Sequence, residues 1–351
     1  MLRRVVLTGV GVVGPGLVGG GQTLRGWLAK PPSPPPDRVV DDTLLAALMD
    51  GADARRTSRV SRFTVAATRL ALADAGLDDV SAAGFVLGTE HGDLHSAIEF
   101  SEGFLRGGPP GISALLFPNT VMNTMASATT IACGARGPAL TLNVRTVGGE
   151  LAVARAAHTI AAGRLEVALA GGVDVRNPTV EATLAELGAG AEIRGEGATV
   201  LVLESLDHAR ARGASPAGEI LGAAWRGLPA RPNGVGRRVE SRSIADALAE
   251  SGLPGGAIAW AYCSLNGDGP RDAWERALLA QALGPEVTVA SLARHFGQHA
   301  GLGALRVAAA AWSAAAGRLV DPPIDVPPGP GLVHGVARGG TQVALVVGDG
   351  S

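Results

Sequence analysis

Two pairs of histidines have a spacing that would suit metal binding. His91 and His95 lie four residues apart, and so do His295 and His299. On a helix, residues four apart share one face, and two imidazoles there can bind one metal ion. Neither pair has a clear third ligand nearby in the sequence, so hydrogen-bonding or surface roles are favoured. We therefore expect no metal site.

Three glycines near the start of the chain match a nucleotide-binding pattern. Gly9, Gly11 and Gly14 follow an apolar run with the spacing G-x-G-x-x-G. A dinucleotide-binding loop of this kind must open a helix at its third glycine and needs an acidic residue about 20 residues later. Here Pro15, Gly16 and then a proline-rich stretch follow instead. The glycines are expected to form a tight structural turn, and no cofactor is expected.

The chain holds two cysteines and one lysine, and these counts limit its chemistry. Cys133 and Cys263 lie in apolar surroundings, which favours buried, unreactive thiols in a reduced cytoplasmic setting. Lys30 stands just before a proline-rich segment at 31–38. A P-loop lysine or a Schiff-base lysine deep in the fold is therefore excluded.

The composition describes a folded protein without a strong preference for polyanions or membranes. The 351 residues are 46% hydrophobic and 18% charged, with a formal net charge of -2. This balance argues against nucleic acid as a partner. The longest apolar candidate, residues 151–173, is interrupted by Arg155, Arg164 and Glu166. No membrane span is expected.

Apolar runs alternate with helical patterns along the whole chain. Strands are expected at 5–8, 85–87, 139–144, 167–170, 200–203, 257–263 and 343–347. Helices are expected at 62–75, 148–162, 272–283 and 303–316. Most of these strands are continuous apolar runs, which indicates burial on both faces. The pattern predicts an α/β protein with helices on both sides of its sheets.

Several short motifs together resemble the β-ketoacyl-acyl carrier protein synthases of the thiolase superfamily. They occur in the family's order at residues 4–11, 62–77, 88–89, 117–120, 134–138, 168–174, 196–204 and 339–341. The resemblance implies a thiolase-like fold with two similar halves, residues 1–212 and 213–351. It also implies a layered α-β-α-β-α arrangement of mixed sheets.

The resemblance also locates the catalytic positions, and all of them are substituted. Thr146 stands where the family has its nucleophilic cysteine, at a strand-to-helix turn after Gly137-Pro138. Asn266 replaces the first active-site histidine and Gln298 the second, although a one-residue shift would place His299 there. A threonine hydroxyl needs an adjacent base, and amides cannot shuttle protons near neutral pH.

Two further departures accompany these substitutions. Arg338 occupies the family's gating phenylalanine position, and we expect it to face a carboxylate, a phosphate or the surface. The segment between Asp174 and Glu196 is short where active members carry a longer cap over the site. No catalytic residue is therefore expected.

These departures resemble the chain-length-factor subunits, non-catalytic relatives that pair with an active ketosynthase. We expect a heterodimer with such a subunit in type II polyketide, polyene or fatty-acid-like biosynthesis, formed through the strand at 139–144. The residues expected to shape a shared acyl tunnel are Ala97, Leu116, Val121 and Met122. Ordinary core packing is the alternative for these four residues.

A basic cluster at the start of the first long helix offers a second contact. Its members are Arg55, Arg56, Arg59 and Arg62. A solvated helix face would explain them, but their location resembles the patch that receives acidic acyl carrier proteins. Two alternatives to the heterodimer remain open. One is a homodimeric acyltransferase or malonyl-thioester decarboxylase with a non-cysteine site, and the other is an acyl carrier protein binding module.

Overall fold

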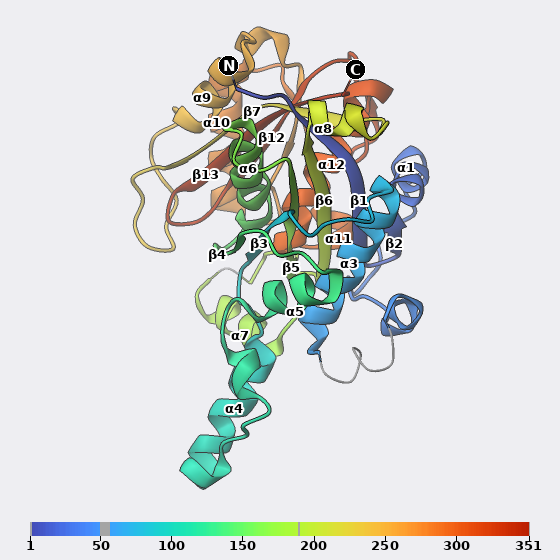
Figure 1. Ribbon diagram of the computed structural model, residues 1–351. Coiled ribbons are helices and arrows are strands. Elements are labelled where there is room, and N and C mark those ends of the chain that lie inside the picture. Colours follow the sequence, from blue (N-terminus) through green and yellow to red (C-terminus); the bar gives the residue numbers. More distant parts are fainter. Residues whose placement is uncertain (1, 50–56, 189, 351) are drawn as a thin grey trace.

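The sheet of the protein repeats one strand order in its two halves (Figure 1). A computed structural model describes residues 2–49, 57–188 and 190–350. In the first half the order is β4-β3-β5-β6-β1, made by β1 (Val5–Gly14), β3 (Gly84–Thr89), β4 (Ala139–Asn143), β5 (Val167–Asp174) and β6 (Gly197–Ser205). In the second half it is β9-β8-β12-β13-β7, made by β7 (Gly218–Gly227), β8 (Trp260–Cys263), β9 (Thr288–Ala290), β12 (Gly331–Val336) and β13 (Thr341–Gly348).

The pairing directions repeat as well. In each half the two outermost pairs are parallel and the next two are antiparallel. The halves join where β1 pairs with β7, with Val5 opposite Ile220. The second half begins with β7, which follows α8 (Leu206–Ala211) in the chain. A division of the chain into units at residues 212 and 213 stays a prediction.

Helices cover both faces of the sheet and fill the space between its halves. The central pair is α6 (Gly148–Ala161) and α12 (Ala300–Ala316), which contact each other and strands of both halves. On the outer face of the first half lie α3 (Arg59–Ala75) and α5 (Thr124–Cys133). On that of the second half lie α9 (Arg242–Ser251) and α10 (Gly269–Leu283). The predicted α-β-α-β-α layers are thereby confirmed.

Short elements complete the chain. Two further pairings are made by β2 (Leu17–Gly20) with β1 and by β10 (Arg318–Leu319) with β11 (Ile324–Asp325). The remaining helices are α1 (Gly21–Ala29), η1 (Asp42–Leu48), α4 (Leu94–Gly107), η2 (Pro109–Gly111), η3 (Phe117–Thr120), α7 (Pro178–Glu186), η4 (Gly255–Ala257) and α11 (Ala293–Phe296).

The N-terminal glycines lie inside a strand, so the predicted tight turn was wrong. β1 continues to Gly14, and the turn follows at Pro15 and Gly16. A Cβ on Gly9 would lie 2.4 Å from the Ala71 carbonyl oxygen, and one on Gly11 1.9 Å from that of Ala67. The glycines therefore allow α3 to pack directly on the β1 backbone.

Neither histidine pair lies on one helix. His91 precedes α4, which begins at Leu94, and His299 caps α12 whereas His295 belongs to α11. The prediction for the cysteines holds in part. Cys263 is buried and Cys133 only partly so, and burial raises the pKa of both thiols. In the described part of the chain, no helix is long and apolar enough to cross a membrane.

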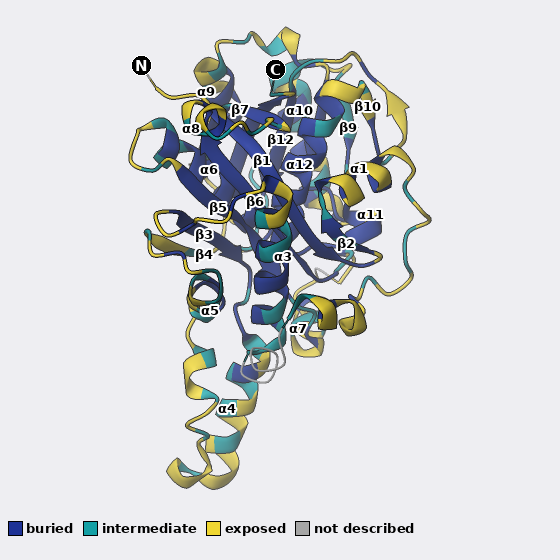
Figure 2. Cartoon of the chain, turned by 45° about the vertical axis from the view of Figure 1, so that its right-hand side comes forward, coloured by how far each residue is buried: buried dark blue, intermediate teal, exposed yellow. Residues whose placement is uncertain are grey.

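An arm made of α4, η2 and η3 projects from the body (Figures 1 and 2). Residues coloured as exposed cover most of its outer surface. The arm nevertheless carries large apolar side chains, namely Phe104, Leu105, Ile112, Leu115 and Phe117. Exposed apolar residues gathered in this way are typical of an interaction surface.

Candidate functional site

Thr146 lies at a sharp turn between β4 and the N-terminus of α6. Its φ angle is +67°, and the residue is buried. Backbone N–H groups at a helix N-terminus lack partners within the helix and attract negative charge. Here the Thr146 amide donates a hydrogen bond of 3.0 Å to Oε1 of Glu90, at the end of β3. A carboxylate of the chain itself thus occupies this donor.

Gln298 contacts the same two residues. Its Nε2 donates to Glu90 Oε1 at 2.8 Å and to the Thr146 carbonyl at 3.0 Å. The ring of His299 instead packs next to Gly197 and Gly301. Burial lowers the pKa of His299 to about 3, so its imidazole is neutral near pH 7. Of the two alternatives from the sequence, Gln298 is the residue that reaches the Thr146 turn.

Glu90 is the centre of a buried ionic network. Arg194 Nη1 binds Glu90 Oε2 at 2.9 Å and Glu192 at 3.3 Å, and Arg145 binds Glu192 at 2.7 Å. Burial opposes ionisation of Glu90, but Arg194, His91 and the hydrogen bond from Gln298 outweigh it and lower the pKa to about 2. The carboxylate is therefore charged at neutral pH. We call Glu90, Arg145, Glu192 and Arg194 the Glu90 network.

Asp174 ties the segment around Glu90 to the start of α12. Its Oδ1 accepts from the Thr89 hydroxyl at 2.8 Å and from the Glu90 amide at 2.9 Å, and its Oδ2 accepts from the Ala300 amide at 2.7 Å. Burial, and next the charge of Glu90, raise the pKa of Asp174 to about 7. This carboxyl group holds the end of β3 and the Gln298 segment in register.

Asn266 belongs to a second polar cluster on the other side of Ile193. Its Oδ1 accepts from Arg271 Nη2 at 2.8 Å. The backbone of Ile193 bonds to Asn266 through its N–H and to Gln298 through its carbonyl, both at 2.7 Å. The segment around Ile193 therefore separates Asn266 from the Thr146 turn, and Arg271 already binds the amide oxygen of Asn266.

Arg338 faces a carboxylate, one of the outcomes expected for it. Its Nε and Nη2 bind the two oxygens of Asp268 at 2.5 and 2.6 Å, and its Nη1 donates to the Asn233 carbonyl at 2.9 Å. The paired geometry neutralises the guanidinium. The assignment of Arg338 to the family's gate position stays a prediction.

Comparisons with known proteins identify the family. The family model of the β-ketoacyl synthase N-terminal domain matches residues 41–209. A Streptomyces halstedii protein described as a polyketide β-ketoacyl synthase 1 is 32% identical over 335 residues, which cover 81% of this chain and 78% of that protein. The chain belongs to the β-ketoacyl synthase family.

Solved structures extend the agreement in fold to the whole chain. One described as the ishigamide ketosynthase/chain length factor has a TM-score of 0.85 at 24% identity and covers 99% of both chains. A second is the AntDE:AntF complex of a type II acyl carrier protein with its ketosynthase. It has a TM-score of 0.81 at 19% identity, again over 99% of both chains.

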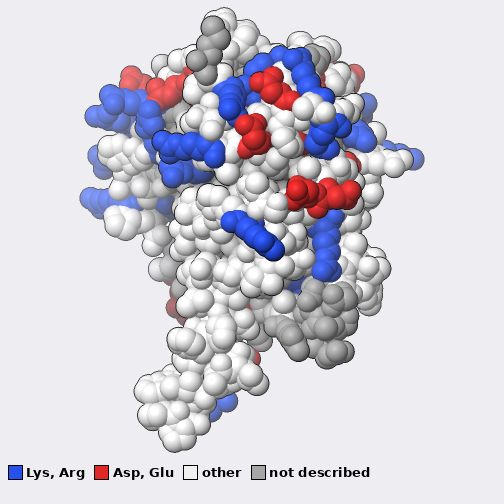
Figure 3. Space-filling view, in the orientation of Figure 1, with Lys and Arg blue, Asp and Glu red and all other residues white. Residues whose placement is uncertain are grey.

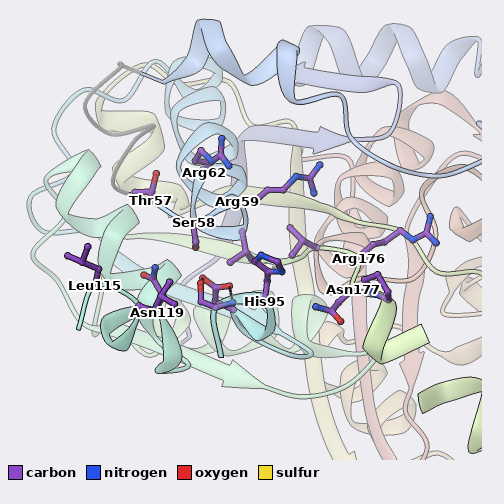
Figure 4. Close-up of a pocket in the computed structure, with 15 residues that line it drawn as sticks. Thr57, Ser58, Arg59, Arg62, His95, Leu115, Asn119, Arg176 and Asn177 are labelled. Carbon is purple, nitrogen blue, oxygen red and sulfur yellow. Dashed lines mark hydrogen bonds between the residues drawn. The ribbon is translucent and has the colours of Figure 1, made fainter. Parts of the chain in front are cut away.

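The four predicted tunnel residues differ in how far they are buried. Val121 and Met122 are exposed, so ordinary core packing does not explain them. Ala97 and Leu116 are half-buried on the arm. Leu116 lines a cavity of about 670 Å³ between the arm, the start of α3 and the start of α7 (Figure 4). Arg59, Arg62 and His95 line the same cavity.

Only part of the basic cluster at the start of α3 is described by the structure, and Arg59 in it is already paired with carboxylates. Arg55 and Arg56 lie outside the described residues. Arg59 is bound by Glu196 at 2.6 Å and by Asp42 at 2.9 Å, and its guanidinium stacks on Phe63. Arg62 makes no comparable pair within the described chain, and its buried Nε has no hydrogen-bond partner there. Docking through these residues stays a prediction.

Sequence reasoning missed the residues that now fill this ketosynthase site. The available signal was a glutamate directly after the β3 motif Gly88-Thr89, and a Glu-x-Arg at 192–194 in the shortened cap. Charges at strand ends are usually solvated, so their burial against one another could not be predicted without the fold. As arranged, the site offers Thr146 no hydrogen-bonded imidazole within the described residues.

Proposed function

We propose that this chain is a non-catalytic, chain-length-factor-type subunit that pairs with an active ketosynthase. The complex would act in type II polyketide, polyene or fatty-acid-like biosynthesis, with this chain shaping the acyl tunnel. The observation that carries the proposal is the hydrogen bond from the Thr146 amide to the Glu90 carboxylate. Acyl transfer is stabilised by backbone N–H donors aimed at the developing oxyanion, and here a carboxylate already occupies the donor at the turn.

The charge of Glu90 opposes both acyl transfer and malonyl decarboxylation at the Thr146 turn. An oxyanion or a malonyl carboxylate placed at the Thr146 turn would meet a buried negative charge. Charges that approach in a poorly solvated site repel strongly. The amide of Gln298, which could otherwise cradle an oxyanion, is bonded to the same carboxylate. These contacts disfavour the homodimeric acyltransferase or decarboxylase.

The partner surface is supported by the edge of the sheet. β4 is the last strand on its side, where it pairs with β3, and most of its residues are exposed or half-buried. Leu140 on β4 and Ile131 on α5 are exposed, the latter at 82%. An open edge flanked by apolar residues favours pairing with another strand. The arm extends this apolar surface and would reach the partner.

The descriptions of the structural neighbours support the same assembly. One neighbour is a ketosynthase/chain length factor, and another holds a ketosynthase with its acyl carrier protein. We therefore propose a catalytic ketosynthase and an acyl carrier protein as partners of this chain. We also propose the reduced cytoplasm as its location, where the two free cysteines would persist.

Co-expression with a ketosynthase encoded beside this chain tests the proposal. The two proteins should co-purify as a heterodimer, and Leu140→Asp should abolish the pairing while leaving the circular dichroism spectrum unchanged. Leu187→Asp, an exposed leucine just after α7, is the matched control and should still pair. A stable homodimer that ignores the ketosynthase would contradict the proposal and favour the enzyme alternative.

A further inference from the structure

The connection from β7 to α9 carries a cluster of exposed arginines. Its members are Arg231, Arg237, Arg238 and Arg242, and we call them the basic loop patch. Within the described chain, their guanidinium groups form no ion pair or hydrogen bond. Glu240 is the one acidic residue between positions 228 and 242. Figure 3 shows basic side chains over much of the upper part of the molecule, with acidic side chains among them.

The loop is held in place through its backbone. The Trp274 indole donates to the Arg238 carbonyl at 2.7 Å, and the Leu228 amide donates to the Gly340 carbonyl at 2.7 Å. Gly236 packs directly on Trp274, where a Cβ would lie 2.4 Å from the ring. Because the fold does not use the guanidinium groups, they remain available on a preformed surface.

The patch lies beside the gate position of the site. Arg338 donates to the Asn233 carbonyl, and the Gly339 amide donates to the Gly234 carbonyl at 2.9 Å. Arg338 also binds Asp268, two residues after Asn266. A molecule bound to the patch would therefore lie at the edge of the site and not at a remote face.

Several arginines elsewhere are paired with carboxylates. Arg59 on α3 is bound by two carboxylates, Arg4 by Glu219, and Arg226, next to the loop, by Asp246. Exposed arginines without an ion pair in the described chain also occur singly, at Arg25, Arg136, Arg164, Arg210 and Arg276, whereas the loop gathers four of them between positions 231 and 242. Such a surface attracts an acidic partner and orients it during encounter.

We propose that the basic loop patch docks the acidic surface of an acyl carrier protein, with its tether directed toward the gate segment 338–340. This inference rests on the proposed function. It assigns carrier-protein docking to the basic loop patch and not to the arginines of α3, for which the sequence predicted that role. Exposed charge pairs of this kind weaken as salt rises, because screening acts over about 10 Å at 0.1 M.

The test uses the co-purified heterodimer and a type II holo acyl carrier protein labelled on its tether thiol. Fluorescence anisotropy at rising salt compares the wild type with a variant in which all four arginines are replaced by serine. We expect affinity to fall about tenfold at low salt, equivalent to about 1.4 kcal/mol, with a shallower salt dependence. Replacing Arg25, an exposed arginine on α1, by serine is the control and should change nothing.

The other outcomes would overturn the inference. Unchanged affinity in the quadruple variant would show that the carrier protein docks elsewhere, on α3 or on the partner subunit. An equal loss of affinity with Arg62→Ser alone would place the docking site on α3. A matching loss of binding to anionic vesicles or to a single-stranded oligonucleotide would make the patch a general polyanion surface. In each case a heterodimer that still forms would leave the proposed function intact, whereas failed pairing would count against that function and not against the patch alone.

Discussion

The Glu90 carboxylate lies 3.0 Å from the backbone amide of Thr146, joined to it by a hydrogen bond. The amide belongs to the turn that precedes α6, and the carboxylate belongs to the residue that directly follows β3. This contact places a buried carboxylate against the turn at which the proposed function expects no catalysis.

The ion pair between Arg194 and Glu90 should contribute strongly to stability. Arg194→Met leaves Glu90 buried without its nearest cation, and removing one partner of a buried pair costs about 3–5 kcal/mol. We expect a loss in the free energy of unfolding at the lower end of that range, since Gln298 and the Thr146 amide still bind the carboxylate. Urea denaturation measures it.

A control and a second variant sharpen this test. Arg106→Met removes an exposed pair with Glu102 on the arm and should cost less than about 0.5 kcal/mol. Adding Glu90→Gln to Arg194→Met should recover part of the loss, because the unpaired buried charge is then removed. A double variant that loses the sum of both single changes would show that the pair is not coupled.

The backbone at Thr146 should be strained. Its φ of +67° is unfavourable for a β-branched residue, and such positions cost about 1–3 kcal/mol. Thr146→Gly should therefore raise the free energy of unfolding, by about 1 kcal/mol, in thermal or urea denaturation. Thr141→Gly, in the extended strand β4, should lower it. Destabilisation by both changes would contradict a strained turn.

Stability should depend on pH through His299. Its pKa falls from 6.5 to about 3 in the folded chain, mainly because the ring is buried. Below pH 6.5 the unfolded chain therefore binds more protons at this residue, and stability falls as the pH falls toward 3. The slope is at most about 1.4 kcal/mol per pH unit.

The variant His299→Gln isolates this contribution. Other groups with shifted pKa values, including His91 and Asp174, are present in both proteins. Between pH 7 and pH 5 the wild type should lose about 1–2 kcal/mol more than the variant in urea titrations. Parallel stability profiles would show that His299 is not held neutral by burial.

The tunnel prediction can be checked on the arm. Ala97 lies half-buried on α4, one turn after the Asp93 cap, on the element expected to shape the acyl tunnel. Ala97→Phe in a reconstituted heterodimer should shorten the products, because the larger ring would occupy tunnel volume. Mass spectrometry of the products gives the answer, and Ser101→Phe, on the exposed part of α4, is the control. An unchanged product distribution would remove Ala97 from the tunnel.

The sequence predicted the elements that have simple patterns. The helix at 62–75 and the strands at 85–87 and 200–203 were found, because apolar periodicity and a helix-ending glycine mark them. The same reasoning failed at Gly9 and Gly11, since close packing of α3 on β1 is a long-range requirement. A glycine pattern alone cannot distinguish a turn from such a contact.

The resemblance assigned Thr146 and Gln298 to catalytic positions, and that assignment stays a prediction, although the structure brings the two residues into contact. The charged residues around them were not predicted. Glu90, Arg145 and Arg194 come from three separate segments, and only folding brings their charges together. No spacing rule connects residues that are far apart in the chain, so this network required the structure.

Condensation activity of the separate and the paired subunits distinguishes the proposed function from the enzyme alternative. The purified chain, the partner ketosynthase and their complex are each incubated with acyl and malonyl thioesters of a holo acyl carrier protein, and condensation products are quantified. The account predicts no condensation by this chain alone and full activity only in the complex. Turnover by the chain alone that disappears in Thr146→Ala would contradict it.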